Sequence, residues 1–226
     1  MPEGNILHRI ARVHGQWLVG RSFTADSPQG RFPAGCGSPP LHLAGPQACE
    51  LLSHEDAAEL RSRLGPDPLR PDASPSRALE ALRKGRIPLA AALLDQGRIA
   101  GVGNILRAEA LFLARLPPLR PASELRIAEF ERLWEALRLL MEDAARDGRI
   151  VTPHAPPAPW ETPGKRREDR FSVYDREGQP CPRCATPLSR VTLAGRGLFF
   201  CPGCQTPHEH TASVARRKEM EHAPRK

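Results

Sequence analysis

Long apolar runs are missing from this sequence of 226 residues. Charged residues interrupt every candidate stretch before it reaches the roughly 18 consecutive apolar residues of a membrane span. The amino terminus also lacks the basic segment and apolar stretch that together make a secretory signal. We therefore expect no membrane partner and a reducing, intracellular compartment.

Cysteine and lysine are also scarce, with six cysteines in all and only four lysines among 33 basic residues. In a reducing compartment, cysteines are more often metal ligands than disulfide partners. Apolar residues make up 40% of the chain, which is enough for a core and excludes a wholly disordered protein. The length suggests one or two domains.

Positive charge is concentrated in the last third of the chain. Residues 1–72 carry a net charge of −1 and residues 73–148 a net charge of +2, whereas residues 149–226 carry +6. Such a basic segment is typical of a protein that binds a phosphate backbone. A solubilising tail would have the same composition, so charge alone leaves both interpretations open.

Apolar residues at spacings of three and four predict helices in the first two thirds of the chain. A first helix is expected over Gly4 to Leu18, followed by a strand over Val19 to Thr24. Ser53 and Ser74-Pro75 are typical of helix starts, because a serine side chain caps the first turn and a proline suits its first position.

Three more helices are expected in the middle of the chain. The first is short and spans Ile87 to Leu94. Asn104 is expected to cap the second, and the third runs from a Ser123 cap to a Gly148 stop with Ile127 on its buried side. Their apolar stripes are typical of a helical core.

Two C-x2-C pairs near the carboxyl end predict a metal site. Each pair aims two thiolates at one point, and two pairs complete the tetrahedron that structural Zn²⁺ prefers. Strands are expected at Arg190 to Leu193 and Leu198 to Phe200, joined by a turn over residues 194–197. We therefore expect one structural zinc ion, bound by Cys181, Cys184, Cys201 and Cys204.

The remaining cysteines and two late histidines do not fit this pattern. Cys36 and Cys49 have no ligand spacing and are expected to be ordinary thiols. His208 and His210 follow a site that already has four better ligands.

A glycine-rich turn separates the two helices that precede the long one. Gly101 and Gly103 allow the backbone to approach a ligand closely, and the next helix offers unpaired N–H groups. This combination is typical of an anion site, and for a basic protein the natural anion is a nucleic-acid phosphate. A tight helical hairpin would use the same glycines, so the turn alone does not decide.

The amino terminus carries two residues with potential chemistry. Removal of Met1 would leave Pro2 as a free secondary amine, and an α-amino group with a pKa near ~8 is partly unprotonated at neutral pH. Attack of this amine on an aldehyde gives an iminium that serves as an electron sink, with Glu3 adjacent to move protons. Pro2 and Glu3 are also typical of an ordinary helix start, and on these residues alone that interpretation is favoured.

Four motifs in order resemble the bifunctional DNA glycosylase/AP lyase family that contains formamidopyrimidine-DNA glycosylase and endonuclease VIII. The start Met1-Pro2-Glu3-Gly4 resembles the endonuclease VIII branch. Leu64 to Leu69 and Leu93 to Glu109 resemble the entry to the helical domain and its helix–two-turns–helix DNA clamp, and Val173 to Gln205 resembles its zinc finger.

The resemblance implies a role for each matching residue. Pro2 would attack the sugar C1′ and displace a damaged base flipped from the stack, while Glu3 would act as the acid and base. Asn104 and the adjoining backbone of Gly103 would hold a phosphate beside the lesion, and Arg196 would hold flanking phosphates. The implied partner is double-stranded DNA that contains oxidised bases or abasic sites. The protein would be a monomer in the cytoplasm of a bacterium, associated with the nucleoid.

The chain departs from the family in its N-terminal domain. The family has a complete β-sandwich after the first helix and a catalytic lysine on one of its hairpins, whereas the first lysine here is Lys84. The loop that fills the gap left by a flipped base is missing as well. Either the chain has lost internal strands, or the natural protein has a segment that this sequence omits.

These observations predict an α+β fold: an N-terminal helix with an incomplete β-sandwich, then a helical helix–two-turns–helix domain with a zinc-finger hairpin. The expected parts are an N-terminal catalytic domain over 1–72, a DNA-binding domain over 73–150, a proline-rich linker over 151–170, a zinc finger over 171–205 and a disordered basic tail over 206–226.

The expected function is removal of oxidised bases, with pyrimidines favoured, followed by β,δ-elimination through a proline iminium. The alternative is a catalytically impaired paralogue that binds damaged DNA through the clamp and the finger. A zinc-ribbon RNA-binding protein would explain the finger and the charge, but not Pro2, Glu3 or the clamp.

Overall fold

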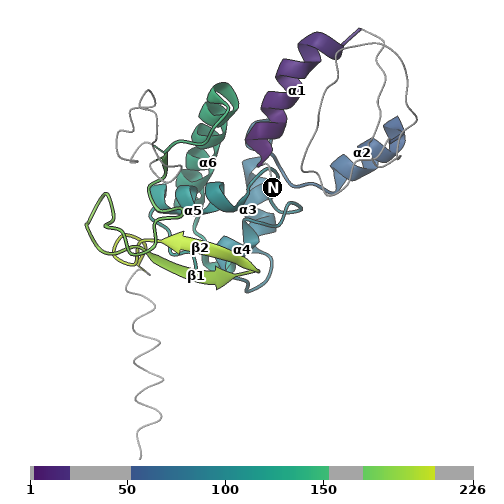
Figure 1. The fold of residues 1–226 in the computed structure, drawn as a ribbon. Helices are drawn as coiled ribbons and strands as arrows, with labels where there is room; N and C mark the ends of the chain where they lie inside the picture. Colours follow the sequence, from purple (N-terminus) through teal and green to yellow (C-terminus); the bar gives the residue numbers. More distant parts are fainter. Residues whose placement is uncertain (1–2, 21–51, 153–169, 207–226) are drawn as a thin grey trace, which may run out of the picture.

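The structure is a computed structural model that describes residues 3–20, 52–152 and 170–206 (Figure 1). In chain order the elements are α1 (Gly4–Leu18), α2 (His54–Ser62), α3 (Pro75–Arg83), α4 (Leu89–Ala92), α5 (Asn104–Leu113), the 3-10 helix η1 (Ala122–Glu124), α6 (Ile127–Asp147), β1 (Ser189–Leu193) and β2 (Arg196–Phe200). The fold is α+β, as predicted. None of the described helices is long and apolar enough to cross a membrane.

The expected N-terminal sandwich is not present in the described residues, where β1 and β2 are the only strands. Val19 and Gly20 form a turn and not the start of a strand. Residues 21–51, which include the rest of that predicted strand and Cys36 and Cys49, lie outside the described ranges. Pro2, His208, His210 and most of the predicted linker and tail lie outside them too.

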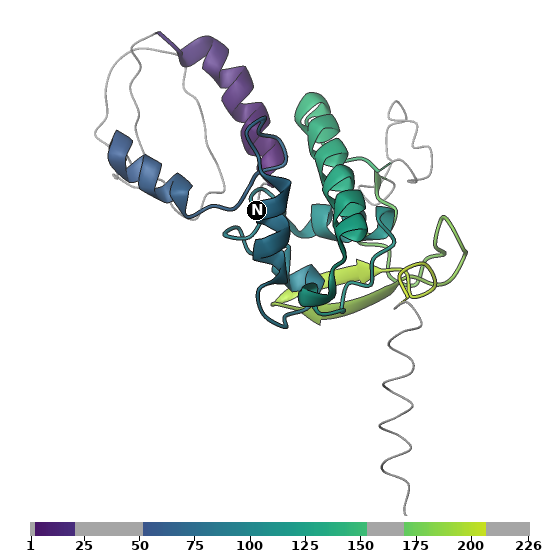
Figure 2. The same cartoon turned by 180° about the vertical axis from the view of Figure 1, so that it is seen from behind.

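Helices α3 to α6 form the body of the protein around one apolar core (Figure 2). The stripe of α6 that was predicted to be buried does face inward, with Leu133 and Leu137 fully buried. α5 crosses it and buries Leu106 and Leu111. Helix α2 stands apart from this body and has no buried residue, so its Leu60 remains 52% exposed.

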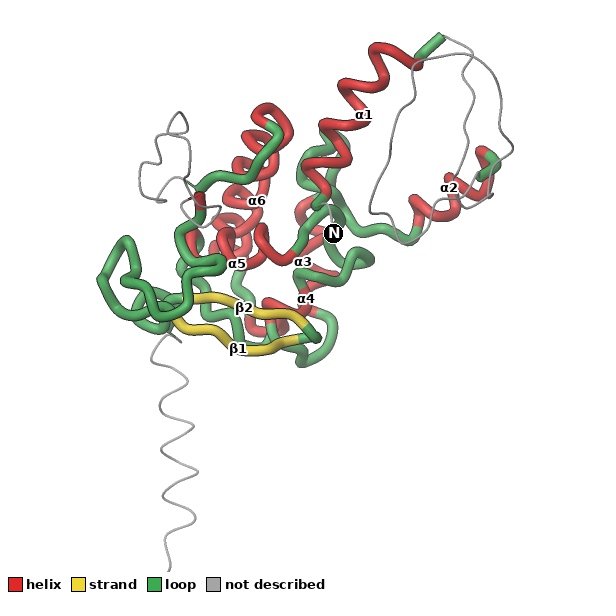
Figure 3. The backbone as a smooth tube through the Cα atoms, viewed as in Figure 1, coloured by secondary structure: helices red, strands yellow, loops and turns green. Residues whose placement is uncertain are grey.

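The strands β1 and β2 form an antiparallel hairpin that lies across one end of the helical body (Figure 3). Leu193 pairs with Arg196, so the turn consists of Ala194 and Gly195 alone and not of the four residues predicted. Both residues have positive φ, which is the conformation that two-residue hairpin turns require. Leu198 and Phe171 belong to the same core as the helices, so the finger is packed onto the body.

Helix α1 stands beside α6 and is held there mainly by polar contacts (Figure 1). Arg9 and Arg12 donate to the carbonyls of Ala145 and Arg146 near the end of α6. The apolar stripe of α1 is only half-buried within the described residues. Its position is therefore set by hydrogen bonds to the helical body more than by burial.

Several predicted helix starts are confirmed and others are wrong. Ser53 and Ser74 cap α2 and α3 by accepting from the backbone N–H three residues on. Ser123 does not cap α6, because Pro121 diverts the chain into η1 first. The helix begins at Ile127, which is 61% exposed and not buried, and it stops as predicted before Gly148, whose backbone is left-handed.

The helix predicted over Ile87 to Leu94 is also shorter than expected. It is reduced to the single turn of α4, Leu89–Ala92. Its first residues are tied instead to the chain before η1, with Leu89 N–H donating to the Arg120 carbonyl at 2.8 Å.

Candidate active-site cleft and zinc centre

The four predicted metal ligands meet at one point at the base of the hairpin. Their sulfur atoms all lie within 4.8 Å of one another, and Cys181 and Cys204 are 3.8 Å apart. With Zn–S bonds of about 2.3 Å, tetrahedral coordination places sulfur atoms about 3.8 Å apart. The donor set therefore fits a single closed structural zinc site, with no position left for a substrate.

Metal analysis of protein purified without chelator is expected to find one zinc ion per chain. Replacing Cys184 by Ser should abolish this stoichiometry, because three thiolates do not close the tetrahedron. The double variant Cys36→Ser with Cys49→Ser is the matched control and should keep its zinc. Zinc loss in that control, or zinc retained by Cys184→Ser, would contradict the assignment.

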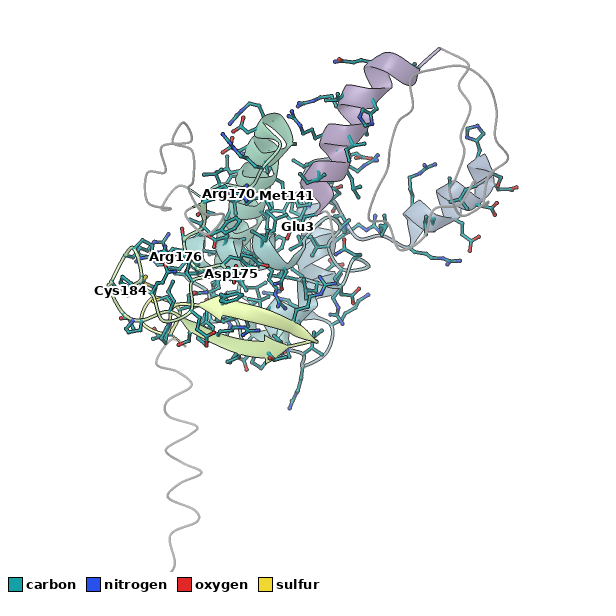
Figure 4. The ribbon with its side chains drawn as sticks, viewed as in Figure 1. Glu3, Met141, Arg170, Asp175, Arg176 and Cys184 are labelled. Carbon is teal, nitrogen blue, oxygen red and sulfur yellow. The ribbon has the colours of Figure 1, made fainter. Side chains whose placement is uncertain are left out.

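Glu3 is buried against the first turn of α5, at the foot of α1 (Figure 4). Its carboxylate accepts from the N–H of Ile105 at 2.7 Å and from that of Leu106 at 3.1 Å. Burial raises the pKa of Glu3 above its ordinary value, although these N–H groups oppose the shift. The acidic side chain thus occupies the helix N-terminus that the sequence suggested for a phosphate.

Two glycines make this approach possible. A Cβ atom on Gly103 would lie 2.4 Å from Cγ of Glu3, and one on Gly4 would lie 2.4 Å from Cα of Gly101. Gly101 also has φ +83°, and its carbonyl accepts from the Gly4 N–H at 2.9 Å. The glycine-rich turn therefore serves, within this structure, to bring the start of α1 against α5.

Asn104 does not cap α5, because Gly103 holds the N-cap position and Asn104 is the first helical residue. Its side-chain Nδ2 donates to the Gly197 carbonyl at 3.0 Å, which joins α5 to the tip of the hairpin. Its Oδ1 is buried and has no hydrogen-bond partner among the described residues.

Two arginines bring positive charge to the same region. Arg196 starts β2 at the hairpin tip, and Arg107 of α5 is fully buried beneath it. Burial is the main cause that lowers the pKa of Arg107 to about 10, and the positive charge of Arg196 is the second. The guanidinium therefore stays charged at neutral pH. Arg107 also donates to the Gly197 carbonyl at 3.3 Å.

A cleft of about 620 Å³ brings the predicted residues together. Its lining includes Glu3, Gly103, Asn104 and Arg196, from the start of α1, the glycine turn, α5 and the hairpin tip. Four residues that the sequence analysis placed in one site are thus neighbours here. Pro2 lies outside the described residues.

Sequence reasoning gave no role to Gln96, which supports the glycine turn from within. Its side chain accepts from the Gly101 N–H at 2.8 Å and donates to the Val102 carbonyl at 2.9 Å. The position of Gln96 between a short apolar helix and the glycine turn was the only sequence signal for this role. It did not distinguish the role from an ordinary helix end, where a glutamine after Asp95 is equally typical.

Sequence reasoning also gave no structural role to Glu109. It is completely buried on α5, and its carboxylate accepts from the N–H groups of Ser172, Val173 and Tyr174 at 2.7–3.0 Å. Burial raises the pKa of Glu109, against the effect of these three donors. The contact ties the start of the zinc finger to the helical body.

Two segments of the chain match models of known protein families. Residues 64–154 match the formamidopyrimidine-DNA glycosylase H2TH domain. Residues 178–207 match a zinc finger found in FPG and IleRS. The matched segments coincide with the helical body and with the zinc finger described above.

Curated relatives extend the similarity beyond these segments. Endonuclease 8 1 of Mycobacterium tuberculosis (strain ATCC 25618 / H37Rv) is 33% identical over 271 residues, which cover 91% of this chain and 100% of the relative. That alignment is longer than the 226 residues of this chain, so part of the relative has no counterpart here. Formamidopyrimidine-DNA glycosylase of Thermus thermophilus is 44% identical over 144 residues, which cover 63% of this chain and 54% of the relative.

Solved structures share the described fold. The MutM (Fpg) protein of Thermus thermophilus has a TM-score of 0.55 at 40% identity, with 67% of this chain and 57% of that chain covered. Lactococcus lactis Fpg in complex with abasic-site DNA has a TM-score of 0.58 at 27% identity, with 70% and 58% covered. This chain therefore spans little more than half the length of these solved proteins.

Proposed function

This chain belongs to the formamidopyrimidine-DNA glycosylase and endonuclease VIII family of DNA glycosylases and AP lyases, and from that premise we propose that it processes abasic sites and oxidised bases in double-stranded DNA. The reaction is β,δ-elimination through an iminium formed by Pro2. Its setting is the bacterial cytoplasm, at the nucleoid, where the DNA lies.

The observation that carries this proposal is the placement of Glu3. The carboxylate is anchored on the N-terminus of α5 and lines one cleft with Asn104 and Arg196. Pro2 is covalently joined to Glu3, so its amine lies within one residue of that anchor, because neighbouring Cα atoms are about 3.8 Å apart. The carboxyl group that lines the cleft therefore belongs to the residue that directly follows the proposed amine nucleophile.

The electrostatics of the cleft suit a DNA strand. Arg196 and the buried Arg107 supply positive charge for the phosphates that flank an extruded nucleotide. The raised pKa of Glu3 favours its protonated form, which is the form that donates a proton to the opening sugar ring. The Asn104 amide donates one N–H to the Gly197 carbonyl, and its second N–H is the donor for a phosphate oxygen.

The lyase step demands less of the chain than base excision. An abasic sugar is already an electrophilic aldehyde when it opens, so a free Pro2 amine can attack it directly. Excision also requires a base to be flipped, held and converted to a leaving group, and the hairpin lysine and gap-filling loop that serve those steps are missing from this sequence. Losing one electrostatic donor at such a site typically costs on the order of 10²–10³ in rate.

We expect borohydride to trap the 226-residue chain on abasic duplex DNA, with AP-lyase turnover that exceeds excision of an oxidised pyrimidine by on the order of 10²-fold or more. Single-turnover assays on matched duplexes measure both rates. Robust pyrimidine excision with no trapping on abasic DNA would overturn the assignment.

Among oxidised bases we propose a preference for pyrimidines. This rests on the Met1-Pro2-Glu3-Gly4 start and on the endonuclease 8 relative that aligns with 91% of the chain. A panel of duplexes that carry single oxidised pyrimidines or 8-oxoguanine tests it.

Arg196→Ala is expected to weaken binding to all duplex sequences alike and to lower the salt slope of binding by about one unit. The reason is that a guanidinium at the hairpin tip neutralises a phosphate and reads no base. Fluorescence anisotropy over a salt series measures the slope. A lesion-selective loss with an unchanged slope would contradict a phosphate role.

The second candidate is a damaged-DNA-binding protein without excision activity. The matches of residues 64–154 and 178–207 to known families favour it, because they lie on the helical body and the finger while the sandwich strands are missing from the described residues. Binding to abasic DNA without borohydride trapping would select this candidate.

A further inference from the structure

A histidine–aspartate pair lies in the same cleft. His8 Nε2 and Asp67 Oδ2 are 2.7 Å apart, and Asp67 Oδ1 accepts from the Leu69 N–H at 2.9 Å. Both side chains line the cleft together with Glu3. The Asp67 side chain is 17% exposed and that of His8 is 37% exposed. The carboxylate is therefore fixed on both oxygens, while part of the imidazole is open to solvent.

The proposed reaction needs more proton transfers than Glu3 is arranged to perform. β,δ-Elimination removes protons from two sugar carbons, yet both Glu3 oxygens are engaged by the N–H groups of α5 and the residue is 9% exposed. Of the other titratable side chains described in the cleft, Tyr174 and Arg196 offer a phenol and a guanidinium, which are poor proton acceptors near neutral pH.

His8 meets the requirements for this role. An imidazole accepts and donates protons readily near neutral pH. With Nε2–H directed at Asp67, the tautomer leaves a lone pair on Nδ1, and a base oriented by a second group is the arrangement that proton-transfer sites use. His8 follows Gly4 by four residues of α1, or about 6 Å along the helix axis, which is on the scale of one nucleotide.

We infer that His8, oriented by Asp67, is the proton acceptor for elimination at the abasic sugar. The inference rests on the proposed function, since it requires the iminium between Pro2 and C1′. His8 takes the proton from C2′, and the electron pair of that C–H bond forms a C1′=C2′ bond as the iminium π electrons move to nitrogen. The nitrogen lone pair then forms the C1′=N bond again, the C1′=C2′ pair moves to form C2′=C3′, and the C3′–O bond breaks, so the 3′-phosphate leaves with its electrons. The proton on His8 then passes to water.

The test separates iminium formation from elimination. On an abasic duplex, the borohydride-trapped fraction reports the first step, and the single-turnover rate of strand cleavage reports the second. For His8→Gln we expect an unchanged trapped fraction and cleavage slowed by about 10²-fold, the usual contribution of a positioned base. Asp67→Asn should slow cleavage by a smaller factor and also leave trapping unchanged.

Chemical rescue distinguishes proton transfer from a structural effect. His8→Ala opens space at a partly exposed position, so added imidazole should restore much of the lost cleavage rate and should leave His8→Gln unaffected. His54→Gln is the matched control, because His54 is exposed on α2 away from the cleft, and it should cleave at the full rate.

The outcomes are distinguishable. Full-rate cleavage by a folded His8→Gln variant overturns the inference, as does a loss in His8→Ala that imidazole does not relieve. If substitution of His8 unfolds the chain, unchanged cleavage by Asp67→Asn contradicts the pair in the same way. Absence of trapping by the unaltered chain would instead refute the proposed function.

Discussion

A chain with a short Gly-Ser extension placed ahead of Pro2 is expected to lose both borohydride trapping and strand cleavage on abasic DNA. The extension converts the Pro2 nitrogen from a secondary amine into an amide, whose lone pair is delocalised into the carbonyl. An amide nitrogen does not attack an aldehyde, so Pro2 forms no iminium and supplies no electron sink for elimination. The measurement is a trapping gel and a cleavage time course on one abasic duplex.

The control for this prediction is the same extension on the carboxyl end, which should leave trapping and cleavage intact. Binding to abasic DNA by anisotropy should change little in either chain, because Asn104, Arg196 and the helical body are untouched. Trapping that persists with the amino-terminal extension would mean that a lysine or the new terminal amine, and not Pro2, is trapped. With four lysines in the chain, that outcome is readily traced by substitution.

The double variant Pro2→Gly with Glu3→Gln removes the proline ring and the carboxylate together and should also lose the full reaction. Its folding must be checked by thermal melting, because Glu3 joins α1 to α5 through two backbone N–H groups. The amino-terminal extension keeps Glu3 and is therefore the cleaner test of the amine.

Local sequence signals predicted much of this molecule. The zinc ligands followed from spacing alone, because a C-x2-C turn determines where its two thiolates point. The caps at Ser53 and Ser74 and the stop at Gly148 are likewise properties of a few neighbouring residues. Such features are predictable because the interaction that stabilises them is made within one turn of chain.

Features that depend on distant residues were not predicted. The turn before α5 was interpreted either as an anion site or as a tight helical hairpin, and neither interpretation included the carboxylate of Glu3, which comes from about a hundred positions earlier. Asn104 looked like a cap because its type favours that position, whereas Gly103 holds it so that Glu3 can approach. Tertiary packing overrode local propensity at this helix start.

The contacts that hold α1 were also beyond sequence reasoning. The missing lysine and loop indicated a departure from the family, but composition gave no account of how α1 would be held without the complete sandwich of the family. In the structure, α1 is held by hydrogen bonds between Gly4 and Gly101, between Glu3 and the N–H groups of α5, and between Arg9 and the end of α6. These contacts follow from the fold and carry no periodic signal.

Glu109→Ala is expected to destabilise the junction between α5 and the zinc finger by roughly 3 kcal/mol or more. The change leaves the N–H groups of Ser172, Val173 and Tyr174 without their acceptor, and each unsatisfied buried donor costs about 1–3 kcal/mol. Tyr174 and Arg196 line the cleft, so loosening the finger should also weaken DNA binding. Denaturant unfolding measures the decrease in the free energy of unfolding, and the m-value should not change.

Glu131→Ala, at an exposed position on α6, is the control and should change stability by less than about 0.5 kcal/mol. Glu109→Gln should fall between the two variants, because one amide oxygen can still accept from Val173 and Tyr174, which share the same carboxylate oxygen. A loss for Glu109→Ala no larger than that of the control would show that the contact contributes nothing.

The pH dependence of stability gives a second measure of the same contact. Burial raises the pKa of Glu109 in the folded state, so the protonated form is the favoured one there. Its contribution to stability is fully present below the pKa of the unfolded chain and is lost as the pH rises through the raised folded value. Glu109→Gln does not titrate, so its stability deficit relative to the unaltered chain should shrink from mildly acidic to mildly alkaline pH. A deficit that grows with pH would mean that the three N–H donors outweigh burial and lower the pKa of Glu109 instead.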